Sequence, residues 1–118
     1  RWIPIRPGTD GALALAMANV IIANKLYDAS FVANYTVGFS EFSALVATRT
    51  PAWAEKITGV PAGTIAAVAT ELATTKPAVV DVWSGPGHHT NGTEGTRAIA
   101  MLAGLLGWLG TVLGRPVR

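Results

Sequence analysis

The chain has 118 residues, enough for one small domain with a modest core; 50% of them are hydrophobic and only 14% are charged. An ordinary soluble domain carries about 25% charged residues, so part of this surface is expected to face protein, cofactor or lipid. The net charge of +2 comes from scattered Lys and Arg without a basic run interleaved with aromatic residues, which argues against nucleic-acid binding. The absence of cysteine excludes disulfides, thiolate metal sites and cysteine nucleophiles within the chain.

A succession of short helices is predicted over about residues 1–76. Each of the first four begins near a side chain that can accept hydrogen bonds from the unpaired amides of the first helical turn. The predicted capping residues are Thr9 or Asp10, Asp28, Ser40 and Thr50, and the helices that follow them run over about 11–25, 29–36, 41–49 and 51–58. A fifth helix over about 60–75 places Ile65, Val68 and Leu72 at helical spacing and ends at Lys76-Pro77.

The run AVVDVW, residues 78–83, is predicted to be a strand buried on both faces of a parallel sheet, because it is apolar and rich in β-branched residues. A glycine loop and a helix over about 93–106 follow it. The predicted fold class is therefore α/β: a mostly helical fragment with one clear buried strand, part of a dinucleotide-binding-like parallel-sheet domain. A lone buried strand leaves backbone groups unpaired, so its sheet partners are expected in the segment WIPI, in another copy of the chain, or in sequence missing here.

One partial domain is expected over 1–118, made of the helical segment over about 1–76, a strand-loop-helix unit over about 77–110 and a tail over 111–118. The uncharged run 98–114 is also long enough to raise the alternative of a membrane span. Glycines interrupt this run, which favours a buried helix that ends in a glycine loop.

A tight turn precedes the first predicted helix in the phrase RPGTDGA. Pro7-Gly8 is typical of a turn, and Gly8 lets a ligand approach the backbone closely. Asp10 stands at the start of the helix, where an aspartate commonly caps the first turn. A carboxylate at this place can also accept paired hydrogen bonds from the N1–H and the exocyclic amino group of guanine, an edge that adenine does not offer. Both roles are open for Asp10.

The loop WSGPGHHTNG, residues 83–92, separates the predicted strand from the last helix. Such turns bind ligands in open α/β sheets, because the end of the strand and the start of the helix present backbone donors to an anion. The loop matches neither GxGxxG nor a nucleotide-hydrolysing P-loop, and Ser84 does not lie in a GxSxG motif. His88 and His89 are adjacent, and neighbouring side chains rarely point the same way, so hydrogen bonding is favoured over metal binding.

Several phrases recur together in an order that resembles one known family. These are PGTD with its alanine-rich helix, YDASFVANYTVGF, WAEKITGVPAGTI, and GHHTNG leading into a glycine-terminated helix. In order and spacing, over about residues 2–110, they resemble the molybdopterin oxidoreductases of the dimethyl sulfoxide reductase family. The resemblance implies an internal fragment of a large catalytic subunit, which agrees with the apolar surface and the orphan strand.

The resemblance also implies a cofactor and its contacts. Family members bind molybdenum or tungsten through two molybdopterin guanine dinucleotides and transfer oxygen atoms, hydrogens or electron pairs to or from a small substrate. Carried over by position, Gly8, Thr9 and Asp10 would contact the guanosine end of one cofactor. The loop residues Ser84, Gly85 and His88 would lie near the pterin. The chain departs from the family pattern at Ser84, where a larger side chain is common.

No residue of this chain is expected to be a catalytic group or a metal ligand, because the family's metal ligand, iron–sulfur cysteines and second cofactor site lie outside this segment. The expected partners are the remainder of the catalytic subunit and an iron–sulfur electron-transfer subunit. The predicted function is that of a cofactor-binding segment, inactive as an isolated chain. The alternative is a small non-enzymatic interaction or membrane-associated module that uses residues 98–114, and the fragment could also associate with itself.

Overall fold

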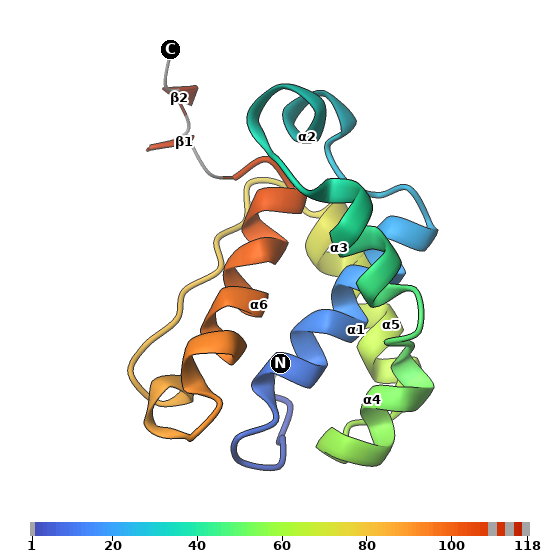
Figure 1. Ribbon diagram of the computed structural model, residues 1–118, viewed down its shortest axis with the longest axis vertical. Helices are drawn as coiled ribbons and strands as arrows, with labels where there is room; N and C mark the ends of the chain where they lie inside the picture. Colours follow the sequence, from blue (N-terminus) through green and yellow to red (C-terminus); the bar gives the residue numbers. More distant parts are fainter. Residues whose placement is uncertain (1, 109–110, 113–114, 117–118) are drawn as a thin grey trace.

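Helices pack around a central helix in the computed structural model, which describes residues 2–108, 111–112 and 115–116. The helices of this part of the chain are α1 Asp10–Ala23, α2 Ala29–Tyr35, α3 Phe39–Val46, α4 Pro51–Thr58, α5 Ala62–Thr74 and α6 Gly92–Leu105, with a short 3-10 helix η1 at Pro86–His88. Two short strands, β1 Thr111–Val112 and β2 Arg115–Pro116, pair antiparallel with Thr111 opposite Pro116. Figure 1 shows this arrangement.

The core is centred on α1, which contacts α3, α4, α5 and α6. Its sequence is apolar on all sides, as expected of a helix that is surrounded by others. Ala16, Ala18 and Ile21 are fully buried, and the small alanine side chains let neighbouring helices approach closely. Asn19 is the polar exception, and its side-chain amide donates to the carbonyl of Val46 at 2.8 Å, at the last residue of α3.

Two of the predicted helix caps are confirmed and two are wrong. Asp28 accepts from the Phe31 amide at 2.9 Å, and Thr50 accepts from the Trp53 amide at 3.2 Å. Ser40 instead lies inside α3, which begins after Gly38 in a left-handed conformation. Neither Thr9 nor Asp10 makes a side-chain capping bond, because the Thr9 hydroxyl donates to the Arg6 carbonyl at 2.6 Å and Asp10 is already the first residue of α1.

The predicted buried strand and the α/β fold class are wrong. Residues 78–83 form no strand; they run as an extended segment beside α6 (Figure 1). Alternate side chains along this segment are half-buried and exposed, and Val79 and Trp83 are 84% and 83% exposed. A β-branched run favours extended backbone, but a strand also requires a neighbour for its amides and carbonyls. No segment of the described residues pairs with it, and the pair β1 and β2 is the sheet that this part of the chain contains.

Within the described residues, none of the helices has the length and apolar character that crossing a membrane requires. The uncharged run 98–114 is helical as far as Leu105. The rest of this run includes residues 109–110 and 113–114, which lie outside the described residues.

Helices α1 and α6 lie side by side with their amino-terminal ends at the same end of the molecule (Figure 1). A Cβ atom built on Gly11 would lie 3.0 Å from the Cα atom of Gly95, so the two backbones nearly touch there. At the other end, the Asp28 amide donates to the carbonyl of Leu105 at 2.8 Å. The turn before α1 and the loop before α6 are thereby brought to one end of the fold.

Candidate functional site

The turn before α1 is a compact structure held at both ends. Within it, the Thr9 amide donates to the carbonyl of Arg6 at 3.2 Å. Arg6 is fixed in turn by the end of α4, since its amide donates to the Thr58 carbonyl at 3.0 Å and its guanidinium donates to the Ile57 carbonyl at 2.7 Å. Gly8 has a φ of +78°, in the left-handed region that glycine adopts without steric cost.

Asp10 offers an unused carboxylate at the start of α1. It makes no hydrogen bond or ion pair within the part of the chain that the structure describes, and its side chain is half-buried. It lines a hollow of about 330 Å³ whose other walls include Leu13 of α1, Ile99 of α6 and Val80 of the extended segment. The positive end of the helix dipole favours a carboxylate here. A free acceptor beside apolar walls fits a flat, partly apolar ligand that carries hydrogen-bond donors.

Asp81 lines the same hollow and was not expected at the site. The sequence contained a signal for it, because Asp81 is the only charged residue in the run AVVDVW. In a strand buried on both faces such a carboxylate would have been costly. On the extended segment it is exposed instead.

The loop before α6 carries the other predicted site residues on its surface. Ser84, Gly85 and His88 are all exposed. Their backbone is ordered by short-range hydrogen bonds, from the Gly87 amide to the Ser84 carbonyl at 3.1 Å and from the His88 amide to the Gly85 carbonyl at 3.2 Å. Exposed polar groups on an ordered loop are available to a ligand.

The turn and the loop meet at Gly8. The side-chain amide of Asn91 donates to the Gly8 carbonyl at 3.0 Å, across 83 positions of sequence. The ring of His89 packs over the same glycine, where a Cβ atom on Gly8 would lie 3.2 Å from its Nδ1 atom. The contacts of Gly8 with His89 and Asn91 were not expected from the sequence, which singled out His88 of the same loop for a contact with the pterin. Among the described residues, no hydrogen bond joins Ser84, Gly85 or His88 to the turn.

The acidic and histidine side chains of the described residues form no group of three that could hold a metal ion. The predicted site residues instead offer the free carboxylate of Asp10, the exposed backbone of Gly85, the exposed hydroxyl of Ser84 and the exposed imidazole of His88. Groups of this kind fit an organic ligand that carries hydrogen-bond donors.

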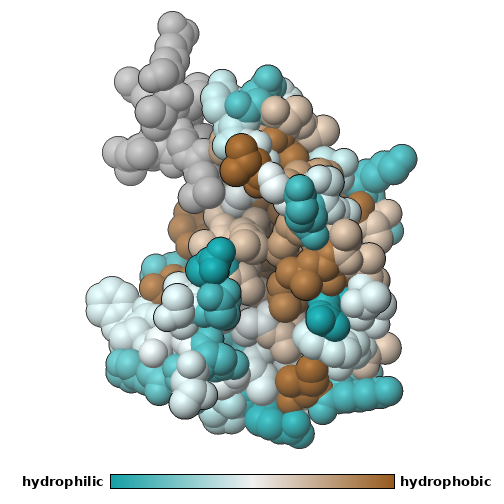
Figure 2. Space-filling view, viewed as in Figure 1, coloured by the Kyte–Doolittle hydropathy of each residue, from teal (hydrophilic) through white to brown (hydrophobic). Residues whose placement is uncertain are grey.

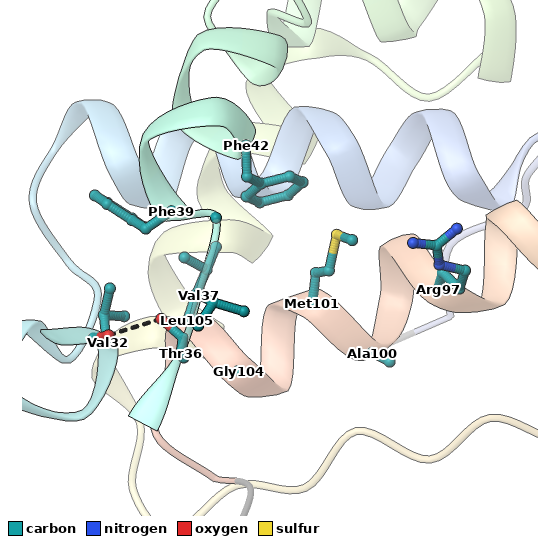
Figure 3. A pocket seen from close by; sticks show the side chains of 11 residues that line it. Val32, Thr36, Val37, Phe39, Phe42, Arg97, Ala100, Met101, Gly104 and Leu105 are labelled. Atoms are coloured by element: carbon teal, nitrogen blue, oxygen red, sulfur yellow. Dashed lines mark hydrogen bonds between the residues drawn. The ribbon is translucent and has the colours of Figure 1, made fainter. Parts of the chain in front are cut away.

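A second cavity of about 400 Å³ lies on the face formed by α2, α3 and α6. Phe42 of α3 faces Met101 of α6 across it, and Arg97 stands at the end opposite Phe39 (Figure 3). Apolar residues gather on this face, whereas the end with the turn and the loop is mostly hydrophilic (Figure 2). None of the predicted cofactor-binding residues lines this groove.

Comparison with known proteins places the chain in a family. The family model for molybdopterin oxidoreductases matches residues 1–115. The chain is 42% identical to the dimethyl sulfoxide reductase DmsA of Escherichia coli, over 92% of this chain and 16% of that protein. It is 38% identical to the arsenate respiratory reductase molybdopterin-containing subunit ArrA of Chrysiogenes arsenatis, over 90% of this chain and 15% of that protein.

A solved structure agrees with these sequence matches. Acetylene hydratase from Pelobacter acetylenicus superposes with a TM-score of 0.87 at 39% identity, over 90% of this chain and 15% of that one. The chain thus spans only about a sixth of the length of the relatives that it matches. The family model, the relatives and the shared fold agree, and the chain belongs to the molybdopterin oxidoreductase family.

Proposed function

We propose that this chain is a cofactor-binding segment of a molybdopterin oxidoreductase and that its turn, residues 6–10, binds the guanosine end of a molybdopterin guanine dinucleotide. Gly8, Thr9 and Asp10 are the proposed contacts. The observation that carries the proposal is the Asp10 carboxylate, which lines a hollow of about 330 Å³ and has no hydrogen-bond partner among the described residues.

The chemistry of guanine explains why an aspartate would recognise it. The N1–H and exocyclic amino groups of guanine are adjacent donors, and the two oxygens of a carboxylate can accept both. Adenine presents an acceptor at N1 and would face the carboxylate unfavourably. The apolar walls at Leu13, Val80 and Ile99 would pack against the flat base. Asp10 therefore supplies selectivity, and the apolar walls supply contact area.

The loop is proposed to contact the pterin through Ser84, Gly85 and His88. Nothing lies within 4 Å of where a Cβ atom on Gly85 would be, which would let a ligand approach the backbone there. The exposed Ser84 hydroxyl and His88 ring would donate or accept hydrogen bonds. When bound, the cofactor with molybdenum or tungsten supplies the redox chemistry, whereas protein residues orient it and set its polarity.

The activity of a complete protein is part of the same proposal. The matched relatives include a dimethyl sulfoxide reductase and a thiosulfate reductase molybdopterin-containing subunit, and the chain covers 16% and 11% of their lengths. We propose that the parent catalytic subunit transfers electrons to or from a small substrate and works with an iron–sulfur electron-transfer subunit. The isolated chain would bind the cofactor's guanosine end without turning over substrate.

Calorimetric titration with GDP and with ADP tests the guanosine contact. The wild-type chain is expected to bind GDP in preference to ADP, and Asp10→Asn is expected to abolish this preference because it replaces one acceptor oxygen with a donor. Glu41→Gln, which neutralises a carboxylate on α3 away from the turn, is the matched control and should leave binding unchanged. Equal affinity of wild type and Asp10→Asn for GDP, with both chains folded by circular dichroism, would contradict the proposal.

An interaction face is a second candidate function, favoured by the apolar groove between α2, α3 and α6. Val37 at its rim is 99% exposed and Met101 is 37% exposed. On this proposal the surface packs against another copy of the chain. Sedimentation equilibrium of wild type and of Met101→Gln tests it. Self-association that the substitution weakens supports it, and a monomer at all concentrations with guanine-selective binding would favour the first function alone.

A further inference from the structure

We propose that Asn91 is a positioning residue, which holds the turn 6–10 in a fixed place relative to the loop 84–91. The inference rests on the proposed function, because that function places cofactor contacts on both segments. Its basis is the hydrogen bond from the Asn91 side-chain amide to the Gly8 carbonyl at 3.0 Å.

The Asn91 side chain does not cap the helix that begins after it. Asn91 is the N-cap residue of α6, and asparagine is among the most favourable residues at an N-cap, because its side-chain oxygen can accept from an amide of the first turn. The Asn91 side chain makes no such bond. Its amide group donates to a residue 83 positions away instead, so the contact serves the junction between the two segments and leaves the first turn of α6 uncapped by a side chain.

The carbonyl that Asn91 binds is close to the proposed guanosine contact. Gly8 precedes Asp10 by two residues, and its φ of +78° lies in the left-handed region. The ring of His89, two residues before Asn91, packs against the same glycine, within 3.2 Å of where a Cβ atom would lie. A donor on one side and a ring packed over the glycine restrict this peptide from two directions.

Substitutions of Asn91 and of Asp10 are therefore expected to have different effects, the first on the affinity for GDP and the second on the preference for GDP over ADP. Asp10 sets the preference for guanine, whereas Asn91 determines how much of the time the turn is in the binding conformation. Loss of one hydrogen bond of this kind weakens a local structure by a factor of about 3 to 10. GDP affinity should therefore fall by up to about that factor when the Asn91 donor is removed, and the ratio of GDP to ADP affinity should stay the same.

Asn91→Asp is the decisive variant. It keeps the shape of the side chain, removes the donor and places an acceptor against the Gly8 carbonyl. Aspartate is also a good N-cap, so α6 should be no less stable than in the wild type. Asn24→Asp is the matched control, because Asn24 donates only to the Val20 carbonyl in its own helix, at 2.8 Å. Asn91→Gln, which retains the amide donor, should recover part of the lost affinity.

Hydrogen exchange of the full 118-residue chain without ligand gives a readout independent of nucleotide binding. In Asn91→Asp, exchange at the Thr9 amide, which donates to the Arg6 carbonyl at 3.2 Å, should be about 3 to 10 times faster, while peptides from α4 and α5 exchange as in the wild type. The control Asn24→Asp should leave the turn unchanged.

Three outcomes separate this inference from the proposed function. Faster exchange in the turn together with weaker, still guanine-selective binding supports both. If the wild type binds no GDP, the proposed function fails in this chain, and the exchange comparison still decides whether Asn91 holds the turn. Unchanged exchange in Asn91→Asp, or a loss of base selectivity equal to that of Asp10→Asn, would overturn the assignment of Asn91 as a positioning residue.

Discussion

Gly11 of α1 and Gly95 of α6 meet backbone to backbone, with only 3.0 Å between the position of a Cβ atom on Gly11 and the Cα atom of Gly95. This contact lies one residue after Asp10 and four residues after Asn91. It allows the amino-terminal ends of two helices, and therefore the turn and the loop that precede them, to lie together. The proposed cofactor site depends on this close approach.

Gly11→Ala is expected to lower the free energy of unfolding by about 1–3 kcal/mol, because the new methyl group would meet backbone that no side-chain rotation can clear. Gly95→Ala is the matched control. Its methyl group would lie 3.7 Å from the Gly11 nitrogen, an ordinary contact, and alanine favours a helix over glycine by up to about 1 kcal/mol. Urea unfolding of the two variants measures the difference, and a Gly11→Ala variant as stable as Gly95→Ala would contradict the close approach.

Gly8→Ala should destabilise the turn for two reasons. An alanine in the left-handed region costs about 1–2 kcal/mol, and its Cβ atom would lie 3.2 Å from the Nδ1 atom of His89. The ring would have to move, and the bond from Asn91 to this peptide would weaken with it. The measurement is the melting temperature of each variant. Gly63→Ala in α5, where nothing lies within 4 Å of the new methyl group, is the control and is expected to stabilise the chain. Equal changes in melting temperature for Gly8→Ala and Gly63→Ala would contradict the strain proposed at Gly8.

Gly107→Ala is expected to cost more stability than Gly59→Ala. Both glycines have positive φ angles, +70° and +77°, so both substitutions carry the same backbone penalty of about 1–2 kcal/mol. A Cβ atom on Gly107 would in addition lie 2.8 Å from Oδ2 of Asp28, whereas Gly59 has open space. Displacing the Asp28 carboxylate would weaken its cap on α2, worth about 1 kcal/mol. Urea unfolding should rank the two, and the opposite order would exclude the clash.

The pKa of Glu41 should rise toward its ordinary value in Ser40→Ala. In the wild type the Ser40 hydroxyl donates to Oε2 of Glu41 at 2.7 Å, and this bond lowers the pKa of the carboxyl. Because the folded pKa lies below the unfolded one, the contact stabilises the fold above the unfolded pKa and is lost as the pH falls through the folded pKa. NMR titration of the Glu41 carboxyl carbon measures the change; an unchanged pKa would assign the shift to the helix backbone.

Features that depend on a few neighbouring residues could be predicted from the sequence. The helices were found because apolar spacing, glycines and capping residues act within one or two turns, as at Asp28 and Thr50. The prediction that Ser40 caps α3 was wrong because the helix begins earlier, directly after Gly38. Two adjacent candidate start positions differ by little free energy. The family was recognisable for a related reason, since its phrases are continuous stretches of chain.

The strand prediction was wrong because a strand requires a second segment to pair with, in addition to residues that favour extended backbone. Residues 78–83 have the composition of a strand and an extended backbone, but pairing depends on whether another segment presents its amides and carbonyls alongside. In this part of the chain α6 lies beside them, and helices have no free backbone groups along their sides to offer.

The sequence alone determined the family, because its phrases are stretches of consecutive residues, and on the same basis it predicts the turn and the loop as the cofactor contacts. Only the folded chain decides that Asn91 donates to the Gly8 carbonyl, that the ring of His89 packs over Gly8, and that Asp10 shares a hollow with Asp81. These contacts join residues that are 71 to 83 positions apart in the chain. Their geometry is set by the packing of α1 against α6, which depends on the shapes of both helices at once and so cannot be found in either segment by itself.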